Sequence, residues 1–369
     1  MRVALVVERF EARGGGVEAV AWTVAHGLAR AGDEVHVFAR RGDPTAPGGP
    51  TLHRLAVAVG WQPLRVLAFS RAAARAAPRS GFDVVQSFSR TRHQDVYRAG
   101  GGCHAAYMER AYGRAGARWR RLSPRHAVLL AVEGAVLRDA SQTVVCNSEM
   151  VRDEIARRYG VPDERLAVIA NGVDTERFHP RRRAGGGARL RQVLGAGSAP
   201  VWLLAGSGLR RKGLDTALTA LARTRSAGVL WVAGGDDPAP WRARVEALGL
   251  AHRVHFLGLR DDLPDVYAGA DALVLPTRYD AFANVCLEAA ASGLAVVTSG
   301  ANGAARWLGE AGVTVEDPDD AGGFAAALDA LAEPARRQAL GAAARRRAEG
   351  ATWARHVETL RALYARVAA

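Results

Sequence analysis

Two carboxylates stand eight positions apart in a stretch that runs from Ala270 to Ser299. Asp280 falls in a predicted loop after a buried strand, and Glu288 falls inside a predicted helix on a stripe of Ala, Val and Leu. A buried carboxylate needs hydrogen-bond partners, and a helix start leaves backbone N–H groups that suit an anion. The stretch therefore predicts two hydroxyl-binding carboxylates with an anion site between them, which matches the ribose, diphosphate and hexose of a nucleotide sugar.

A second candidate for phosphate chemistry is Lys212, the one lysine among 50 basic residues. It lies beside Arg211 in a glycine-rich loop, Gly206 to Gly213, that follows a predicted buried strand. An ammonium and a planar guanidinium differ in geometry, so a close contact to phosphate explains why arginine did not replace this lysine. Chance retention is the alternative. The loop lacks the spacing of a Walker motif.

Other loops that follow predicted strands are weaker candidates. Gly15 and Gly16 precede a predicted helix, where a backbone without side chains can approach phosphate closely, and Gly234 ends another predicted strand. The loop 89–98 carries Asp95 among Arg, His and Gln side chains. Ordinary turns account for lone glycines, and a surface or capping role accounts for Asp95.

The elements that must position these loops alternate between strand and helix along nearly the whole chain. One series of buried strands and helices runs through residues 1–178, and a second begins with the strand predicted over 201–205. This alternation predicts an α/β protein with parallel sheets covered by helices. We expect two doubly wound, Rossmann-like domains facing a central cleft, over 1–178 and 179–350, with a final helix in 351–369 packing back on the first domain. The Pro-, Arg- and Gly-rich segment 179–187 is the predicted linker.

The composition of the 369 residues, 49% apolar and 24% charged, is typical of a folded protein of two domains. No apolar run is long enough to cross a membrane, and Glu8 and Arg9 interrupt the N-terminal one, so we expect neither a membrane span nor a signal peptide. Three cysteines predict a reduced, cytoplasmic protein. The net charge of +13 favours an acidic partner, although an arginine bias in the composition explains it equally well.

Positive charge is concentrated next to aromatic side chains in the segment 105–138, which is predicted to be helical. Arg118, Arg120 and Arg121 stand beside Trp119 and Leu122. This interleaving suits an anionic membrane interface and, in principle, a nucleic acid. An ordinary helical insertion with a solvated basic face is the alternative.

These motifs, in this order, resemble those of glycosyltransferase family 4, which comprises retaining enzymes with the two-domain GT-B fold. The stretch from Asp280 to Glu288 is similar to the family's E-x7-E signature, with Asp in place of the usual first Glu. Arg211-Lys212-Gly213 resembles the phosphate-binding R-K-G, Gly15-Gly16 resembles the N-terminal glycine loop, and residues 171–174 resemble the interdomain N-G-V-D.

Within the family, the chain looks most like the bacterial lipopolysaccharide core glucosyltransferases, which move glucose from UDP-glucose to the first heptose. That finer resemblance rests on residues 94–98, on the basic segment after them and on residues 279–284. It implies a hexosyltransferase that sits peripherally on the inner face of the inner membrane and takes a lipid-linked sugar acceptor. It implies no metal and no cofactor besides the UDP-sugar substrate.

The resemblance also implies a role for each site residue. Glu288 would accept from the ribose hydroxyls, Asp280 would contact the hexose, and Arg211 and Lys212 would neutralise the leaving diphosphate in place of a metal. Asp95 would orient or deprotonate the acceptor hydroxyl. The implied donor contacts are Gly15, Gly16, Gly206, Arg211, Lys212, Gly234, Asp280, Phe282, Ala283, Asn284, Val285 and Glu288. The residues implied to face the acceptor or the membrane are His104, Arg118, Arg120 and Arg121.

Three alternatives stay open at this point. The chain is similar to family 4 as a whole, so a different nucleotide sugar, or a polysaccharide or lipid acceptor, is the first. A nucleic-acid-binding protein is the second, suggested by the charge, although the paired carboxylates argue against it and we expect no nucleic-acid partner. A nucleotide-sugar sensor without turnover is the third, suggested by Asp280 in place of Glu. No D-x-D metal motif ends a predicted strand, and Asp261-Asp262 has a plain turn interpretation.

Overall fold

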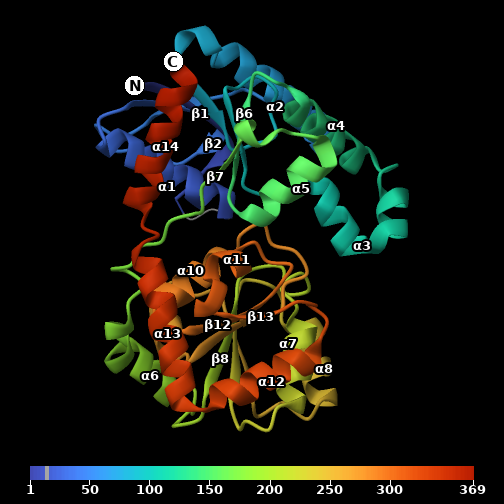
Figure 1. The fold of residues 1–369 in the computed structure, drawn as a ribbon, viewed down its shortest axis with the longest axis vertical. Coiled ribbons are helices and arrows are strands. Elements are labelled where there is room, and N and C mark those ends of the chain that lie inside the picture. Colours follow the sequence, from blue (N-terminus) through green and yellow to red (C-terminus); the bar gives the residue numbers. More distant parts are fainter. Residues whose placement is uncertain (13–15) are drawn as a thin grey trace. The chain divides into compact units, whose positions relative to one another are not determined.

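The chain forms two compact units in a computed structural model that describes residues 1–12 and 16–369. Unit 1 comprises residues 1–171 and 353–369, and unit 2 comprises residues 172–352 (Figure 1). Each unit is a parallel sheet with helices packed on its faces. The predicted α/β class with two doubly wound, Rossmann-like domains is therefore confirmed.

Unit 1 is built on a seven-stranded sheet in the order β3-β2-β1-β4-β5-β6-β7. Its strands are β1 (Arg2–Phe10), β2 (Glu34–Gly42), β3 (Thr51–Arg54), β4 (Val84–Ser87), β5 (Val96–Ala99), β6 (Thr143–Cys146) and β7 (Leu166–Val168). Its helices are α1 (Gly16–Arg30), α2 (Gln62–Ala76), α3 (His104–Arg120), α4 (Pro124–Arg138), α5 (Glu149–Tyr159) and α14 (Trp353–Ala368), with short 3-10 helices η1 (Arg79–Gly81) and η2 (Asp163–Arg165). In register, Leu5 of β1 lies opposite Val37 of β2 and Gln86 of β4.

The last helix of the chain, α14, belongs to unit 1. Val357, Leu360, Leu363 and Tyr364 of α14 join the core that β1 and α1 form, and α14 lies beside α1 (Figure 1). The side chains of α14 face this core at helical spacing, because residues three and four apart share one side of a helix. Tyr364 also donates its hydroxyl to Gln86 Oε1 at 2.8 Å, which fixes the helix to β4.

Unit 2 is built on a six-stranded sheet in the order β10-β9-β8-β11-β12-β13. Its strands are β8 (Val201–Ala205), β9 (Val229–Ala233), β10 (Val254–Gly258), β11 (Ala272–Leu275), β12 (Ala295–Ser299) and β13 (Val313–Val315). Its helices are α6 (Gly186–Val193), α7 (Leu214–Arg223), α8 (Ala239–Ala247), α9 (Leu263–Gly269), α10 (Asn284–Ala291), α11 (Ala304–Leu308), α12 (Ala321–Ala332) and α13 (Pro334–Glu349), with 3-10 helices η3 (Pro180–Ala184) and η4 (Gly309–Ala311).

The strand order of unit 2 reverses between β8 and β11. The chain leaves β8 towards β9 and β10, and then returns to β11 on the other side of β8. Ligands of open α/β sheets bind at the carboxyl edge of the sheet beside such a switch point. The loops that follow the two central strands here are 206–213, after β8, and 276–283, after β11.

The predicted linker 179–187 is wrong. These residues form η3 and the start of α6 within unit 2, and the chain passes between units at 171/172 and 352/353 instead. Arg182 pairs with Asp265 at 2.9 Å and Arg183 pairs with Asp271 at 2.7 Å, so the arginines that suggested a solvated linker bind carboxylates of the same unit. Gly187 is needed for packing, because a Cβ there would lie 2.8 Å from the carbonyl carbon of Ala268.

Candidate active site

The two loops at the switch point of unit 2 bring Arg211, Lys212 and Asp280 together. Lys212 Nζ donates to Asp280 Oδ2 at 2.7 Å, and an Nη of Arg211 donates to the same oxygen at 2.8 Å. The Lys212 side chain is 7% exposed, whereas that of Arg211 is 38% exposed. Lys212 is therefore the desolvated cation of the cluster, and Arg211 contacts Asp280 from the solvent side.

Backbone contacts hold the two loops against each other. Arg278 N donates to the carbonyl oxygen of Arg211 at 2.9 Å, and Thr277 Oγ1 donates to it at 3.1 Å. Gly213 has φ of +76°, and a Cβ at this position would lie 1.9 Å from the carbonyl oxygen of Pro276. Only glycine permits both the left-handed backbone and this approach, so Gly213 determines how closely Lys212 meets Asp280.

The electrostatics of the cluster favour an ionised Asp280. Burial alone would raise the pKa of Asp280, but the charges of Lys212 and Arg211 and their hydrogen bonds lower it below its ordinary value. The hydrogen bonds from Lys212 and Arg211 both go to Oδ2, and no residue in the described part of the chain donates to Oδ1. One carboxylate oxygen thus compensates two cations, and the other is available to a hydroxyl group.

Glu288 lies in α10, partly exposed, and takes part in a different pair. The hydroxyl of Tyr267, from α9, donates to Glu288 Oε2 at 2.8 Å. Burial raises the pKa of Glu288, while the Tyr267 hydrogen bond and the charges of Arg177 and Lys212 act in the opposite direction. The pKa of Tyr267 lies well above its ordinary value because the ring is buried beside this carboxylate, so the phenol stays a donor.

The first turn of α10 differs in part from the predicted anion site. Ala283 N donates to Asn302 Oδ1 at 3.2 Å, so this N–H does not face an anion as predicted. Asn284 and Val285, the first two residues of α10, are partly exposed, and helix geometry supplies no acceptor to the N–H of Val285. Of the three N–H groups predicted to hold phosphate, the structure thus commits that of Ala283 to Asn302, and the anion site at the start of α10 stays a prediction.

Asn302 is a buried organiser of this turn that the sequence did not single out. Besides accepting from Ala283, its Oδ1 accepts from Ala304 N at 3.1 Å, and its Nδ2 donates to Thr298 Oγ1 at 2.9 Å and to Cys286 Sγ at 3.3 Å. A side chain that satisfies two backbone donors in this way fixes the start of α10 relative to the loop after β12. The bonds to Ala283 and Cys286 span 19 and 16 positions of sequence, so a lone Asn in a turn carries no local signal for them.

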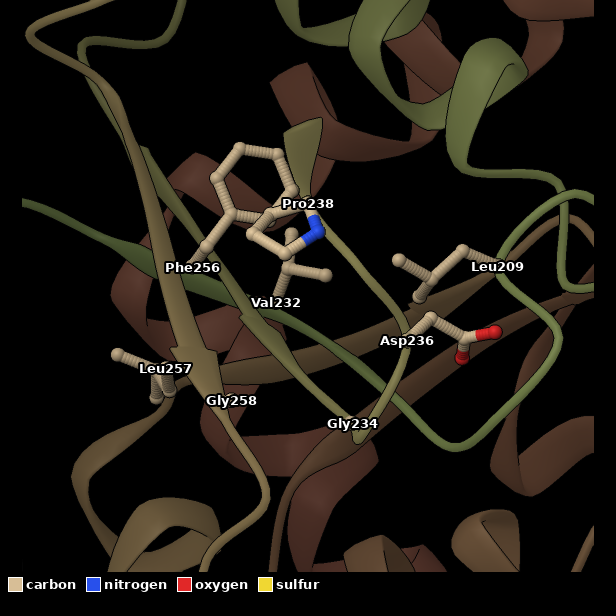
Figure 2. A pocket seen from close by; sticks show the side chains of 8 residues that line it. All are labelled: Leu209, Val232, Gly234, Asp236, Pro238, Phe256, Leu257 and Gly258. Atoms are coloured by element: carbon tan, nitrogen blue, oxygen red, sulfur yellow. The ribbon is translucent and has the colours of Figure 1, made fainter. Parts of the chain in front are cut away.

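An apolar pocket opens beside the cluster at the carboxyl ends of β9 and β10 and encloses about 230 Å³ (Figure 2). It is lined by Leu209, Val232, Gly234, Asp236, Pro238, Phe256, Leu257 and Gly258. The Asp236 carboxylate is its charged group, and Oδ2 accepts from Gly208 N at 2.7 Å, which ties the pocket wall to the loop after β8. The lining combines five apolar side chains with polar backbone and the Asp236 carboxylate, a mixture that suits a planar heterocycle with hydrogen-bonding groups.

Three other predicted residues lie near these groups. A Cβ at Gly234 would stand 2.2 Å from the carbonyl oxygen of Gly206, and one at Gly206 would stand 3.1 Å from Lys212 Cε. The two glycines thus let the ends of β8 and β9 approach each other and Lys212. Phe282 is 5% exposed and packs edge-on against Trp307, with ring centroids 6.1 Å apart, so it supports the loop from inside.

The predicted role of Asp95 in the acceptor site is wrong. Asp95 stands at the amino end of β5, where Oδ2 accepts from Val85 N at 2.8 Å and Oδ1 accepts from Arg79 Nε. Ligand-bearing loops follow the carboxyl ends of parallel strands, so Asp95 occupies the opposite edge of the sheet. Its buried carboxylate ties β4 and β5 to η1, so its role is structural, although it is neither the surface nor the capping carboxylate that the sequence offered as the alternative.

The carboxyl edge of the unit 1 sheet carries other polar groups. His104 begins α3 directly after the loop that follows β5, and its Nε2 lies 3.0 Å from Nδ1 of His126. Burial, with the charges of Arg90, His126 and Arg125, lowers the pKa of His104 to about 3, so the imidazole is neutral. The buried carboxylate of Glu133 accepts from His104 N at 2.7 Å and from Tyr159 at 2.7 Å.

Of the two predicted N-terminal glycines, Gly16 begins α1, and Gly15 lies outside the described residues.

The basic segment has an exposed tip between α3 and α4. Arg118, Arg120 and Arg121 at the end of α3 are exposed, and Trp119 and Leu122 among them are 77% and 74% exposed. Isolated exposed apolar residues are ordinary, but two large ones among three arginines form a compact amphipathic surface. No helix of the described chain is long and apolar enough to span a membrane.

Comparison with known proteins agrees with this geometry. Residues 14–177 match the domain described as Glycosyltransferase Family 4, and residues 199–334 match the domain described as Glycosyl transferases group 1. The protein is therefore a glycosyltransferase of the GT-B fold. It has two parallel-sheet units, and Arg211, Lys212 and Asp280 meet at the switch point of the second. The chain belongs to glycosyltransferase family 4.

Two curated relatives illustrate the range of similarity. The lipopolysaccharide glucosyltransferase WaaG of Escherichia coli is 29% identical over 245 residues, which is 64% of this chain and 64% of that protein. A probable transglycosylase of Burkholderia thailandensis is 30% identical over 331 residues, 88% of this chain and 85% of that protein. The match to WaaG thus spans less than two thirds of the length of either chain.

Solved structures show the same fold. A crystal structure of WaaG, a glycosyltransferase involved in lipopolysaccharide biosynthesis, has a TM-score of 0.84 at 24% identity and covers 98% of this chain and 99% of that one. HepE of Anabaena in complex with UDP-glucose has a TM-score of 0.75 at 18% identity, with 99% of each chain covered. At these identities the likeness defines the fold and leaves the substrates to be argued from the site.

Proposed function

We propose that the protein is a retaining, metal-independent hexosyltransferase that moves glucose from UDP-glucose to a heptose of the lipopolysaccharide core. The observation that carries the proposal is the arrangement at the switch point of unit 2. A cluster of two cations and a carboxylate, a second carboxylate on α10 and an apolar pocket lie on neighbouring loops of one sheet edge. The similarity to WaaG supports the choice of sugar and acceptor.

In this proposal the donor lies along the carboxyl edge of unit 2. The uracil ring occupies the pocket beside Phe256 and Pro238 (Figure 2), and Glu288 accepts from the ribose hydroxyls. The diphosphate lies by Lys212, Arg211 and the first turn of α10. Asp280 Oδ1 accepts from a hydroxyl of the hexose. Asp has one methylene less than the Glu usual in the family, so the hexose must approach this loop more closely.

Charge stabilisation at Lys212 and Arg211 supplies the main catalytic effect. When the bond between the anomeric carbon and the diphosphate oxygen breaks, negative charge grows on the departing UDP, and the two cations stabilise it in place of a metal. The acceptor oxygen bonds to the anomeric carbon on the same face, and its proton passes to the departing phosphate oxygen. We propose no carboxylate nucleophile, because Asp280 is held by both cations and Asp95 lies at the other edge of the unit 1 sheet.

The tip of α3 is proposed to attach the enzyme to the cytoplasmic face of the inner membrane, where a lipid-linked core acceptor resides. Trp119 and Leu122 would enter the interface while Arg118, Arg120 and Arg121 face anionic head groups. Each arginine near such a surface contributes roughly 1 kcal/mol of attraction. The acceptor sugar would bind at the carboxyl edge of unit 1, near His104.

A donor screen tests the central proposal. Thermal unfolding is measured with UDP, GDP and ADP and with their glucose and mannose forms. UDP and UDP-glucose are expected to stabilise the protein by roughly 2.7 kcal/mol at about 100 times the dissociation constant. Selective stabilisation by GDP or ADP forms would overturn the choice of UDP-glucose, and no response to any nucleotide would overturn the proposed activity.

Vesicle sedimentation tests the membrane proposal separately. Replacing Arg118, Arg120 and Arg121 with Gln should release the protein from anionic phosphatidylglycerol vesicles. The matched control replaces Arg223, Arg242 and Arg244, three exposed arginines of unit 2, and removes the same charge elsewhere. Equal loss in both variants would mean that net charge, and not the tip of α3, holds the protein on the vesicles.

A further inference from the structure

The proposed donor site contains a buried tyrosine, Tyr267, that has no role in the proposed transfer reaction. Tyr267 of α9 is 0% exposed, and its hydroxyl donates to Glu288 Oε2 at 2.8 Å across 21 positions of sequence. A phenol in a buried interior needs a partner, but many acceptors serve that need. Here the acceptor is the carboxylate assigned to the ribose, so the tyrosine determines how that carboxylate is presented.

The hydrogen bond divides the two oxygens of Glu288 between protein and ligand. Oε2 is committed to Tyr267, whereas no donor from residues 1–12 or 16–369 is bonded to Oε1. The side chain is partly exposed, so the oxygen without a protein partner is the one that reaches solvent. A glutamate held at one oxygen has lost much of its rotamer freedom, which preorganises the other oxygen for a ligand.

Tyr267 is itself held in place. The Phe178 ring packs on Tyr267 nearly perpendicular to it, at 85° with centroids 5.6 Å apart. One Nη of Arg345, from α13, donates to the carbonyl oxygens of Phe178 at 3.1 Å and of Ala291, the last residue of α10, at 2.5 Å. One arginine thus holds both the backbone of Phe178, whose ring packs on Tyr267, and the end of the helix that carries Glu288.

We infer that Tyr267 is a positioning residue that makes the enzyme select ribonucleotide over 2′-deoxyribonucleotide donors, by fixing Glu288 so that Oε1 faces the ribose 2′-hydroxyl. The inference rests on the proposed function, since it assumes that a nucleoside diphosphate occupies the site. A carboxylate fixed to accept from one hydroxyl is left without its partner when a 2′-deoxy ligand binds, and such sites discriminate strongly.

The experiment compares the binding of UDP and 2′-deoxy-UDP by calorimetry in three proteins. The wild type is expected to bind UDP at least about 10-fold more tightly than 2′-deoxy-UDP, as the loss of one charge-assisted hydrogen bond requires. Tyr267→Phe should lose most of this ratio, through weaker UDP binding, with 2′-deoxy-UDP little changed. Tyr364→Phe is the matched control, because it removes an equally buried hydroxyl with a 2.8 Å bond in unit 1 and should keep the ratio.

The outcomes separate this inference from the proposed function. Failure of the wild type to bind UDP would remove the proposed function itself. Binding of UDP with the same ratio in Tyr267→Phe as in the wild type would overturn the inference alone, as would an equal loss in Tyr364→Phe.

Glu288→Gln provides a second test if Tyr267→Phe does not fold. The neutral amide of the substituted side chain cannot form the charge-assisted bond to the ribose 2′-hydroxyl, so the ratio should fall well below that of the wild type. A ratio retained in Glu288→Gln would also overturn the inference.

Discussion

At the scale of single residues, Asp280 explains why Lys212 and Arg211 stay together at the edge of the sheet before a ligand binds. One oxygen of Asp280 compensates Lys212 and Arg211, two cations that would otherwise lie unpaired at the edge of the sheet. A desolvated cation without a partner is costly, so the carboxylate keeps the cluster assembled before any ligand arrives. This arrangement makes Lys212, the more buried cation, the most informative residue to change.

Lys212→Met is expected to lower the transfer rate by roughly 10²–10³, because it removes a charge at the position where the diphosphate departs. Lys212→Arg is expected to fall well short of wild-type activity as well, since Gly206 packs closely against the lysine side chain. Initial rates with UDP-glucose measure both. Arg210→Ala removes an exposed neighbouring charge as the control, and an equal loss there would contradict a specific role for Lys212.

Glu288 is expected to make the folded protein less stable at neutral pH. Its pKa is raised in the folded protein, chiefly by burial, so the fold favours the protonated acid. That stabilisation is complete below the unfolded pKa of about 4.5 and is lost as pH rises through the folded pKa. Glu288→Gln should therefore raise the melting temperature at pH 7.5, and the gain should shrink towards pH 4. A gain that is the same at both pH values would contradict this account.

At the scale of elements, the site depends on how closely two loops approach at the switch point. Gly213→Ala should separate the loop after β8 from the loop after β11, because its Cβ would stand 1.9 Å from the carbonyl oxygen of Pro276. We expect a loss of roughly 2–4 kcal/mol in stability together with loss of nucleotide binding. Chemical denaturation with and without UDP measures both effects.

Gly249→Ala is the control for backbone strain. Gly249 has a similar positive φ, +68°, but a Cβ there meets nothing within 4 Å. Gly249→Ala should lower the free energy of unfolding by only roughly 1–2 kcal/mol, which is the cost of a left-handed backbone alone. UDP binding should be retained. If the two variants behaved alike, the approach of the loops would not be what Gly213 provides.

At the scale of the whole molecule, unit 2 is one uninterrupted piece of chain with its own sheet and the whole proposed donor site. Residues 172–352 expressed alone are therefore expected to fold and to bind UDP, without transferring glucose. Circular dichroism and calorimetry measure the two properties. The same fragment with Glu288→Ala serves as the binding control. A fragment that folds but does not bind UDP would show that the donor site needs residues of unit 1.

The sequence by itself determined the fold class and most of the strands and helices in their order, although β5 falls largely within the predicted loop 89–98 and α6 begins in the predicted linker. It also singled out the charged residues that the structure brings together after β8 and β11. Buried strands of a parallel sheet appear as short apolar runs, and the helices between them as a 3.6-residue period, so both units could be read locally. Lys212, Asp280 and Glu288 were predicted because each is a chemical exception within its own segment. The one lysine and the carboxylates on apolar stretches need no knowledge of distant contacts to be noticed.

Only the tertiary structure decided which partner each polar group has. Asp95 lies 16 positions from Arg79, and Tyr267 lies 21 positions from Glu288, so no local pattern joins them. The edge of the sheet on which Asp95 falls depends on where β5 begins, and the arginines of 179–187 became packed because Asp265 of α9 and Asp271 after it offer carboxylates. Burial follows from the chain's own composition, but the pairing of buried polar groups is decided by which elements meet, and that is a property of the assembled fold.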